Sequence, residues 1–291
     1  MVSLEELASL DLQLWLRSGE EAANRLHCAQ STISRRNIET RRRFNISMKR
    51  SDGEWRLFGN KAFLNLERQI HQLHRLAHQS QPLRLEANFW ATPVLASPAP
   101  AHWMLGVGDH VGMERPLQLV RERIIDAWIG SYQPDLPEHD SELAIIDLCS
   151  TPVYLVANKN HPLARIQQLT TEDLEKFPSL SIPGKIFPKT EKILKRHQLW
   201  SNPARMQRYK PSAWQGQTED QVTLCYGTCL ALEVMPELTI LDYDLGLISG
   251  ESLVVRRDLL EQPMIKKLLS ILKKRVQQKA KQHGHRLTAL L

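Results

Sequence analysis

Side chains that can contact nucleic acid are concentrated between residues 30 and 50. Gln, Ser, Thr and Arg carry the hydrogen-bond donors and acceptors that read base edges in a major groove, and Arg and Lys neutralise phosphates. The stretch holds seven basic residues and one acid, so its net charge of +6 equals that of the whole chain. The alternative for such a charge run is the solvated face of an ordinary helix. The candidate DNA contacts are Gln30, Ser31, Thr32 and Ser34 for bases, Arg35 and Arg36 for bases or phosphates, and Arg41, Arg42, Arg43, Lys49 and Arg50 for phosphates.

The surrounding pattern predicts a helix-turn-helix that presents these side chains. Residues 4–16 fit a first helix that ends near Gly19. Ser18 and Glu21 have the spacing of a capping box, which starts a second helix. A small apolar face on that helix, formed by Ala22, Ala23 and Leu26, lets another helix approach closely. Residues 27–29 break the period, and the third helix that follows is anchored by Ile33 and carries its polar side chains near its N-terminus.

A β-hairpin is predicted after the third helix. Residues 46–49 and 54–58 have strand patterns, and Asp52-Gly53 between them is a favoured hairpin turn. The hairpin would form a wing tipped with Lys49 and Arg50. We expect Trp55 and Phe58 to cover its underside against the first helix.

The segment AANRLHCAQSTISRR resembles the winged helix-turn-helix of LysR-type transcriptional regulators. The family pattern A-A-x-x-L-x-x-x-Q-x-x-x-S-R is matched by Ala22, Ala23, Leu26, Gln30, Ser34 and Arg35. The sequence departs from the family in three places: Gly19 runs directly into Glu20, Ala29 stands where Ser or Thr often caps the recognition helix, and residues 40–43 replace Leu-Glu-Glu. The resemblance implies double-stranded DNA as a partner, and the third departure favours sequence-independent phosphate binding.

A helix from residue 60 to residue 79 carries a heptad pattern of apolar residues. Such a seam, spaced 3, 4, 3 and 4, joins two copies of a helix, and its members are Phe63, Leu66, Ile70, Leu73 and Ala77. The equivalent linker helix of LysR-type regulators dimerises, so the resemblance also implies a homodimer or homotetramer. The alternative is a helix packed against its own domain.

The remainder of the chain reads as an α/β domain. Gln81-Pro82 ends the linker helix, residues 83–87, 103–107, 143–146, 153–156 and 180–182 have strand patterns, and residues 115–130 and 264–281 have helical ones. Residues 143–164 and 222–237 resemble the effector-binding domain of the same family, although Cys229 replaces its second glycine. We therefore expect an α/β fold with an N-terminal winged helix-turn-helix (1–59), a long dimerising linker helix (60–81) and a C-terminal two-lobed Rossmann-like domain (82–291), similar to type 2 periplasmic binding proteins.

The resemblance implies a small-molecule effector in the cleft between the lobes. Asn88, Thr92 and Thr228 are the candidate effector-binding residues. Each has an alternative as a plain loop or capping residue, and the cleft itself could be vestigial.

Motifs for catalysis and for cofactors do not fit. The segment Gly106–Gly112, GVGDHVG, follows an apolar strand, but its third glycine is one residue late for a dinucleotide fingerprint and Pro116 interrupts the helix that should follow. There is no G-x-S-x-G, P-loop or H-E-x-x-H. The four cysteines lack metal-ligand spacing, so no metal, no cofactor and no enzyme activity are expected. Cys225 and Cys229 fit either a redox pair on one helical face or two core residues.

The composition fits a DNA-binding protein of the cytoplasm. No apolar run reaches the length of a membrane span, and acidic residues occupy the start, where a signal peptide needs a basic one. Residues 262–291 hold eight Lys or Arg and no acid, which fits a solvated helix end or auxiliary phosphate contacts. The alternative function is a small-molecule-binding or catalytic α/β protein whose N-terminal helices serve only oligomerisation.

Overall fold

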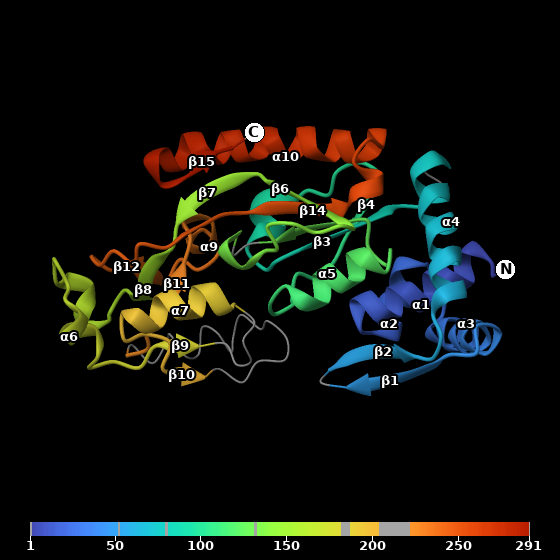
Figure 1. Ribbon diagram of the computed structural model, residues 1–291, viewed down its shortest axis with the longest axis horizontal. Helices are drawn as coiled ribbons and strands as arrows, with labels where there is room; N and C mark the ends of the chain where they lie inside the picture. The colour runs from blue at the N-terminus through green and yellow to red at the C-terminus, as the bar shows by residue number, and fades with distance from the viewer. Residues whose placement is uncertain are drawn as a thin grey trace.

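The computed structural model describes residues 2–51, 53–78, 81–130, 133–181, 187–203 and 222–290. The winged N-terminal part lies at one end of the molecule and the α/β part occupies the rest, with helix α10 along one edge (Figure 1). Three residues of predicted elements lie outside these ranges: Asp52 of the hairpin turn, Gln79 at the end of the linker helix and Ile182 at the end of the predicted strand 180–182.

The winged part has the predicted order of elements. It consists of α1 (Leu4–Leu16), α2 (Gly19–Arg25), α3 (Gln30–Arg43), β1 (Ser47–Ser51) and β2 (Glu54–Phe58). The Ser18 hydroxyl accepts a hydrogen bond from the backbone of Glu21 at 3.2 Å and so caps α2 as expected. The other half of the predicted capping box, from the Ser18 backbone to the Glu21 carboxylate, does not form between these two described residues. The Glu21 carboxylate instead accepts a hydrogen bond from Nε of Arg25 at 2.8 Å. Ala29 precedes α3 without a side-chain cap.

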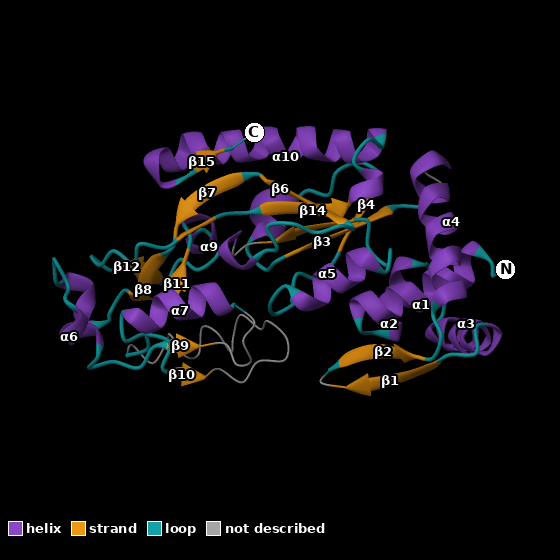
Figure 2. Cartoon of the chain, in the orientation of Figure 1, coloured by secondary structure: helices purple, strands orange, loops and turns teal. Residues whose placement is uncertain are grey.

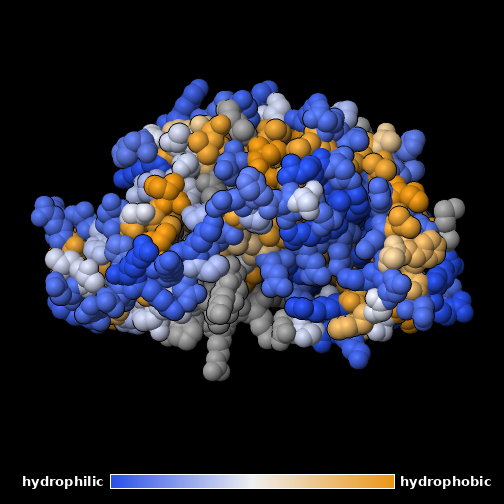
Figure 3. All heavy atoms as spheres, viewed as in Figure 1, coloured by the Kyte–Doolittle hydropathy of each residue, from blue (hydrophilic) through white to orange (hydrophobic). Residues whose placement is uncertain are grey.

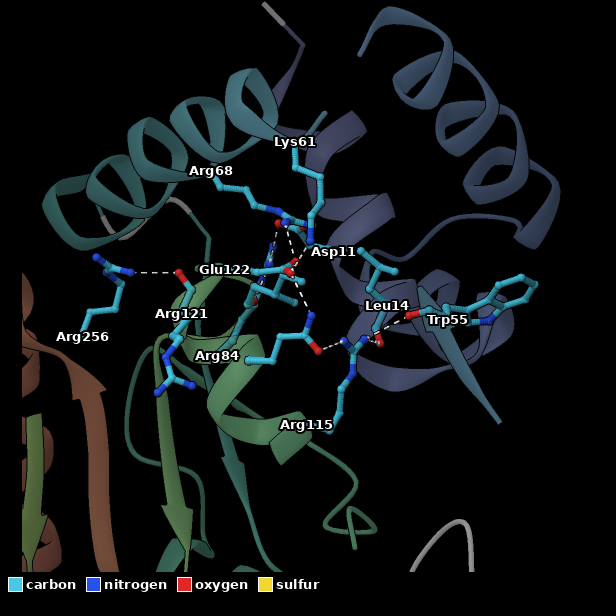
Figure 4. Close-up of polar contacts among 12 residues, drawn as sticks. Asp11, Leu14, Trp55, Lys61, Arg68, Arg84, Arg115, Arg121, Glu122 and Arg256 are labelled. Carbon is cyan, nitrogen blue, oxygen red and sulfur yellow. Dashed lines mark hydrogen bonds and ion pairs between the residues drawn. The ribbon is translucent and has the colours of Figure 1, made fainter. Parts of the chain in front are cut away.

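Helix α4 (Ala62–His78) has a buried polar face and an exposed apolar one. Its buried Arg68 donates to Asp11 of α1 at 2.9 Å and to Glu122 at 3.0 Å (Figure 4). Two turns further along, Arg75 donates to the buried carboxylate of Asp126 at 2.9 Å. This polar face joins α4 to both the winged part and the α/β part, so the alternative of packing against its own chain holds for one side of the helix.

The first lobe contains a five-stranded sheet in the order β4 (Trp103–Leu105), β3 (Leu83–Ala87), β5 (Ala127–Gly130), β14 (Ser252–Arg256) and β6 (Leu143–Asp147). β3 pairs in parallel with β4 and β5, whereas β14 is antiparallel to both of its neighbours. Leu253 and Val255 face the cluster that contains α10 (Pro263–His283), and Val254 faces the cluster that contains α5 (Glu114–Arg121). Helices therefore cover both faces of the sheet (Figure 2).

The second lobe is built around β8 (Tyr154–Asn158), which lies between β11 (Cys225–Gly227) and β12 (Leu238–Ile240). β8 is antiparallel to both of these neighbours. In a separate pair, β9 (Leu180–Ser181) is parallel to β10 (Asn202–Pro203). The other elements of this lobe are α6 (Thr171–Leu174), α7 (Pro188–Arg196) and α9 (Cys229–Leu232). Two segments cross between the lobes, where β7 (Cys149–Pro152) pairs with β13 (Ile248–Ser249) and with β15 (Thr288–Ala289). The predicted two-lobed architecture is confirmed.

Short helical turns complete the chain. A π-helical turn, η1 (Thr92–Ala96), replaces a longer helix after β3, as the prolines of that loop predict. The 3₁₀ turns are η2 (Gln133–Asp135), η3 (Pro162–Arg165), η4 (Arg257–Leu259) and η5 (Gly284–Arg286).

The predicted helix over residues 115–130 is wrong in its second half. Helix α5 ends at Arg121, Arg123 has a φ of 60°, and residues 127–130 form the central strand β5. All four residues of β5 are buried. A short apolar run buried on both faces has no alternation, so periodicity alone does not separate it from a buried helix.

The winged part and the first lobe share one hydrophobic core. Leu10 and Trp15 of α1 belong to the same continuous cluster of buried side chains as Leu117 of α5 and Val254 of β14. Trp15 is fully buried. The two parts are therefore docked against each other within a single chain.

Candidate nucleic-acid interface

Helix α3 presents its predicted base-reading side chains to solvent. Ile33, Asn37 and Thr40 are at most 2% exposed and pack against the rest of the winged part. The opposite face carries four exposed residues at positions i, i+1, i+4 and i+5, with Thr32 and Arg36 partly exposed beside them; the four are Gln30, Ser31, Ser34 and Arg35. The described residues of the α/β part therefore leave the proposed recognition surface uncovered.

A groove of about 930 Å³ runs along this outer face. It extends from α3 to the N-terminal turn of α1, where Ser3 and Glu6 form a reciprocal capping box. It is lined by Ile38 and by eight residues of polar type, which are Ser3, Glu6, Gln30, Ser31, Ser34, Arg35, Arg36 and Glu39. Such a surface offers both hydrogen-bonding groups and cations to a ligand.

Four of the five arginines of α3 fall into two pairs that differ in their partners. Arg35 and Arg36 form no hydrogen bond or ion pair with the described part of the chain, so their guanidinium groups are available to a ligand. Arg42 and Arg43 instead donate to Glu39, at 2.9 and 3.1 Å. Hydrogen bonds from these two arginines hold the pKa of Glu39 below its ordinary value, so this carboxylate stays charged and offsets part of the basic run.

Arg41 turns toward a second, smaller cavity between α3 and the wing. Its Nε donates to the backbone carbonyl of Asn37 at 3.1 Å. The cavity measures about 310 Å³ and is lined by Gln13, Gly19, Gln30, Ile33, Ser34, Asn37, Arg41, Met48 and Trp55. Gln30 and Ser34 line both this cavity and the outer groove, so they stand where a ligand would meet the helix and the wing together.

The outer face of the wing carries a cation that the sequence interpretation missed. The register of the hairpin places Arg56 directly opposite Lys49, and both side chains are exposed. Like charges in directly opposite positions destabilise a strand pair, and an anion between them would relieve the repulsion. The signal was present in the sequence, because the hairpin turn fixes this pairing.

The two aromatic residues of the wing behave differently. Trp55 is partly buried and donates to the backbone carbonyl of Arg17 at 3.3 Å, as expected for the underside. Phe58 is 47% exposed, so its predicted burial is wrong. In the hairpin pairing it shares the outer face with Lys49, whose Nζ lies 5.9 Å from the ring centroid. On the inner face, Arg50 lies 5.8 Å from the Trp55 ring.

The apolar seam of α4 is open to solvent in the single chain. Four of its side chains are between 43% and 60% exposed, namely Phe63, Leu66, Ile70 and Leu73, and Ala77 is also exposed. Apolar surface gathers over α4 at the right of the view (Figure 3). A row of large exposed apolar side chains on one helix marks an association surface.

The three candidate effector residues hold local structure. Asn88 donates to the Glu251 carboxylate at 3.0 Å, and the Thr92 hydroxyl donates to the backbone carbonyl of Asn88 at 3.0 Å. Thr228 caps α9 by accepting from the backbone of Ala231 at 3.3 Å. Asn88 and Thr92 follow β3 on the first lobe, and Thr228 follows β11 on the second. Their role toward a ligand stays a prediction.

Burial favours the protonated thiol at two of the cysteines, Cys149 and Cys229. Burial raises the pKa of Cys149 to about 12 and also raises that of Cys229. Cys225 lies on β11 and Cys229 begins α9, so they do not share a helical face, and both are buried in the hydrophobic core, as the alternative of two core residues predicts. Within the described ranges no group of three or more His, Cys, Asp or Glu side chains is arranged to hold a metal ion. Over the same ranges, no helix combines the length and apolar character of a membrane span.

Residues 109–200 match the family model of the LysR substrate binding domain. Among solved structures, a full-length OxyR variant from Pseudomonas aeruginosa has a TM-score of 0.56 and 15% identity over 94% of this chain and 95% of that chain. An H2O2-bound OxyR mutant from Corynebacterium glutamicum has a TM-score of 0.52 and 15% identity over 95% and 93%. Full-length CbnR complexed with its target DNA has a TM-score of 0.53 and 16% identity over 94% and 99%. No curated protein sequence matches the chain.

These similarities extend over nearly the whole length of both chains in each comparison. At 15–16% identity they establish the fold. The chain therefore has the architecture of a full-length LysR-type regulator, with a winged helical N-terminal part and a two-lobed substrate-binding domain. The resemblance expected from the sequence is confirmed at this level.

Proposed function

We propose that this protein is a sequence-specific, double-stranded-DNA-binding transcription regulator of LysR type that acts in the cytoplasm without catalysis. The observation that supports this function best is the exposed outer face of α3, where Ser34 stands beside Arg35 and Arg36, two cations that form no ion pair with the residues the structure describes. The structure of CbnR with its target DNA supports the same function, since its fold is similar to this one. We place the DNA-binding domain at residues 1–59, the linker at 60–81 and the regulatory domain at 82–291.

The contacts divide into base reading and backbone contact. Gln30, Ser31, Thr32 and Ser34 would read base edges from the N-terminal half of α3. Arg35 and Arg36 would contact bases or phosphates. The remaining cations would contact the backbone on either side, and we add Arg56 to that set of Arg41, Arg42, Arg43, Lys49 and Arg50.

Two copies would present two recognition helices. The exposed seam of α4 would pair with the same seam of a second chain, as heptad positions do. A homodimer of this kind, or a homotetramer made from two of them, binds half-sites about one helical turn apart. Regulation by a small molecule between the lobes is consistent with the H2O2-bound OxyR mutant of similar fold. Burial and raised pKa values disfavour reaction of the Cys149 and Cys229 thiols with peroxide.

Selection of bound fragments from genomic DNA, followed by gel shifts, tests this function. The variant Ser34→Ala with Arg35→Ala should remove the preference for the selected duplex over random duplex, because it deletes a hydrogen-bonding group and a free cation from the outer face of α3. Ser270→Ala with Lys274→Ala is a matched control, since it removes one serine and one basic residue, four positions apart, from the exposed face of α10. Unchanged discrimination by the α3 variant would contradict the assignment.

The salt dependence of binding separates this function from the alternative of a small-molecule-binding or catalytic protein with purely oligomerising helices. A DNA binder should lose duplex affinity as salt rises. A plot of the logarithm of the association constant against the logarithm of the salt concentration should have a slope of about −0.9 for each phosphate contacted. A chain whose N-terminal helices serve only oligomerisation has no reason to show such a slope.

A further inference from the structure

The segment Gly106–Gly112, which fails as a dinucleotide motif, connects β4 to α5. It contacts Glu86 and Thr92 of the first lobe on one side and Arg17 of the winged part on the other. This glycine-rich loop therefore connects the first lobe to the winged part.

The first contact is with the buried carboxylate of Glu86. This group accepts hydrogen bonds from the backbone of Gly108 at 3.1 Å and from the indole of Trp15 at 2.5 Å. A Cβ on Gly106 would lie 2.1 Å from the Glu86 carboxylate, so only glycine leaves room for it there. One carboxylate of the first lobe therefore holds both the loop and helix α1.

The second contact is with the candidate effector-binding region. Gly108 has a φ of 67°, and a Cβ at this position would lie 2.7 Å from the Thr92 hydroxyl. Thr92 follows β3 in the turn η1. A displacement of that turn would therefore press on the loop at Gly108, where no side chain could absorb it.

The third contact is with the wing. Arg17 caps the end of α1 in a left-handed conformation, and its side chain is 1% exposed. It forms ion pairs with Asp109 of the loop and with Glu54 of the wing, the latter at 2.7 Å. The same guanidinium lies 3.2 Å from Nδ1 of His110 in the loop.

Arg115 forms a parallel connection from the first turn of α5, directly after the loop. Its Nε donates to Glu54 at 3.2 Å. Its NH2 group donates to the backbone carbonyls of Leu14 and Trp55, both at 3.2 Å (Figure 4). The Glu54 carboxylate is thus held by one arginine from the winged part and by another from the first lobe.

We infer that the Gly106–Gly112 loop and Arg115 position the wing from the first lobe, so that the packing of the first lobe around Glu86 and Thr92 sets how the wing meets DNA. Glu54 and Arg56 lie two positions apart on the same face of β2, so anchoring Glu54 also fixes the cations of the outer face. Arg115 is a positioning residue in this scheme and touches no DNA. The inference rests on the proposed DNA-binding function.

The test uses the full chain, the selected duplex and hydroxyl-radical footprinting. Arg115→Ala should lower affinity for the selected duplex about tenfold, or about 1.4 kcal/mol, with protection lost beside the wing and retained where α3 binds. Arg115→Lys keeps one cation near Glu54 but loses the forked geometry, so it should restore part of the wing protection. Gly108→Ala should disturb the same protected positions through the loop.

Arg121→Ala is the matched control. It removes an arginine from the same helix whose side chain pairs with Asp140, away from the wing, and it should bind as the parent protein does. Thermal unfolding of each variant separates positioning from folding, because a merely structural loss would weaken all protected positions together.

The inference would be overturned if Arg115→Ala retained full affinity and wing protection, or if all positions faded uniformly in Arg115→Ala, Arg115→Lys and Gly108→Ala. Absence of any selected duplex for the parent protein would instead refute the proposed function, so the two failures are distinguishable.

Discussion

Replacing Ile70 by Glu should separate the two copies of the proposed dimer without unfolding either one. Ile70 lies at the centre of the α4 seam and is 55% exposed in the single chain. The buried face of the same helix, which carries Arg68 and Arg75, is not touched by the change. A loss of association would therefore report on the seam itself.

The size of the effect follows from the exposed fraction. Burying a whole Ile side chain is worth about 1.5–3 kcal/mol, so covering the exposed half contributes roughly 1–1.5 kcal/mol. A twofold dimer covers two such side chains, which gives roughly 2–3 kcal/mol, or a dimer dissociation constant raised on the order of 30- to 150-fold. Dehydrating the new carboxylate adds to this loss.

Sedimentation over a concentration series measures the dissociation constant, and circular dichroism checks that the fold is retained. Asn65→Glu is the control, because it adds the same charge at an exposed position of α4 outside the seam. A duplex with two half-sites should lose affinity for Ile70→Glu more than a duplex with one. Unchanged self-association of Ile70→Glu, or an equal loss in Asn65→Glu, would refute a dimer built on this face.

Two further changes test the buried polar groups. Arg68→Met removes the buried guanidinium that pairs with the carboxylates of Asp11 and Glu122. It should destabilise the fold by about 3–5 kcal/mol, measured as a lower Tm. Lys176→Met, which breaks an exposed ion pair, should change the Tm little. Burial raises the pKa of Glu251 from 4.5 to about 8. Between these two pH values the folded state holds a proton that the unfolded state releases. The contribution of this group to the free energy of unfolding is therefore fully present below pH 4.5 and is lost as the pH rises to 8. Glu251→Gln should therefore gain stability relative to the parent protein between pH 5 and pH 8, and parallel pH profiles of Tm for the two proteins would contradict this assignment.

Local signals predicted most of the winged part correctly. Ser18 identified the start of α2, and Asp52-Gly53 predicted the hairpin between β1 and β2. The 3-4 spacing from Phe63 to Ala77 predicted the apolar face of α4, which is exposed. These features depend on neighbours within a few residues, which is the range over which capping, turn chemistry and helical periodicity act.

Contacts between distant segments had no such signal. Arg115 meets Leu14 and Glu54 across 101 and 61 residues, and Trp15 meets Glu86 across 71. Nothing in the sequence near Arg115 distinguishes a buried cation from an exposed one. The same applies to the polar face of α4, where helical periodicity located the apolar stripe but not the partners of Arg68 on the other side.

The glycine-rich loop illustrates how a motif can mislead. Its spacing invited a nucleotide-binding hypothesis that Pro116 argued against, but the sequence did not show what the glycines do. In the structure, Gly106 and Gly108 leave room for Glu86 and Thr92, and that requirement depends on the packing of three separate segments.

The core shared by α1 and the first lobe has a consequence for engineering. A chimera that grafts residues 1–59 onto another regulatory domain, or a truncation that removes them, would strip the cover from Leu117 and Val254 and expose an apolar face. Swapping modules at the linker would therefore require redesigning both halves of that contact.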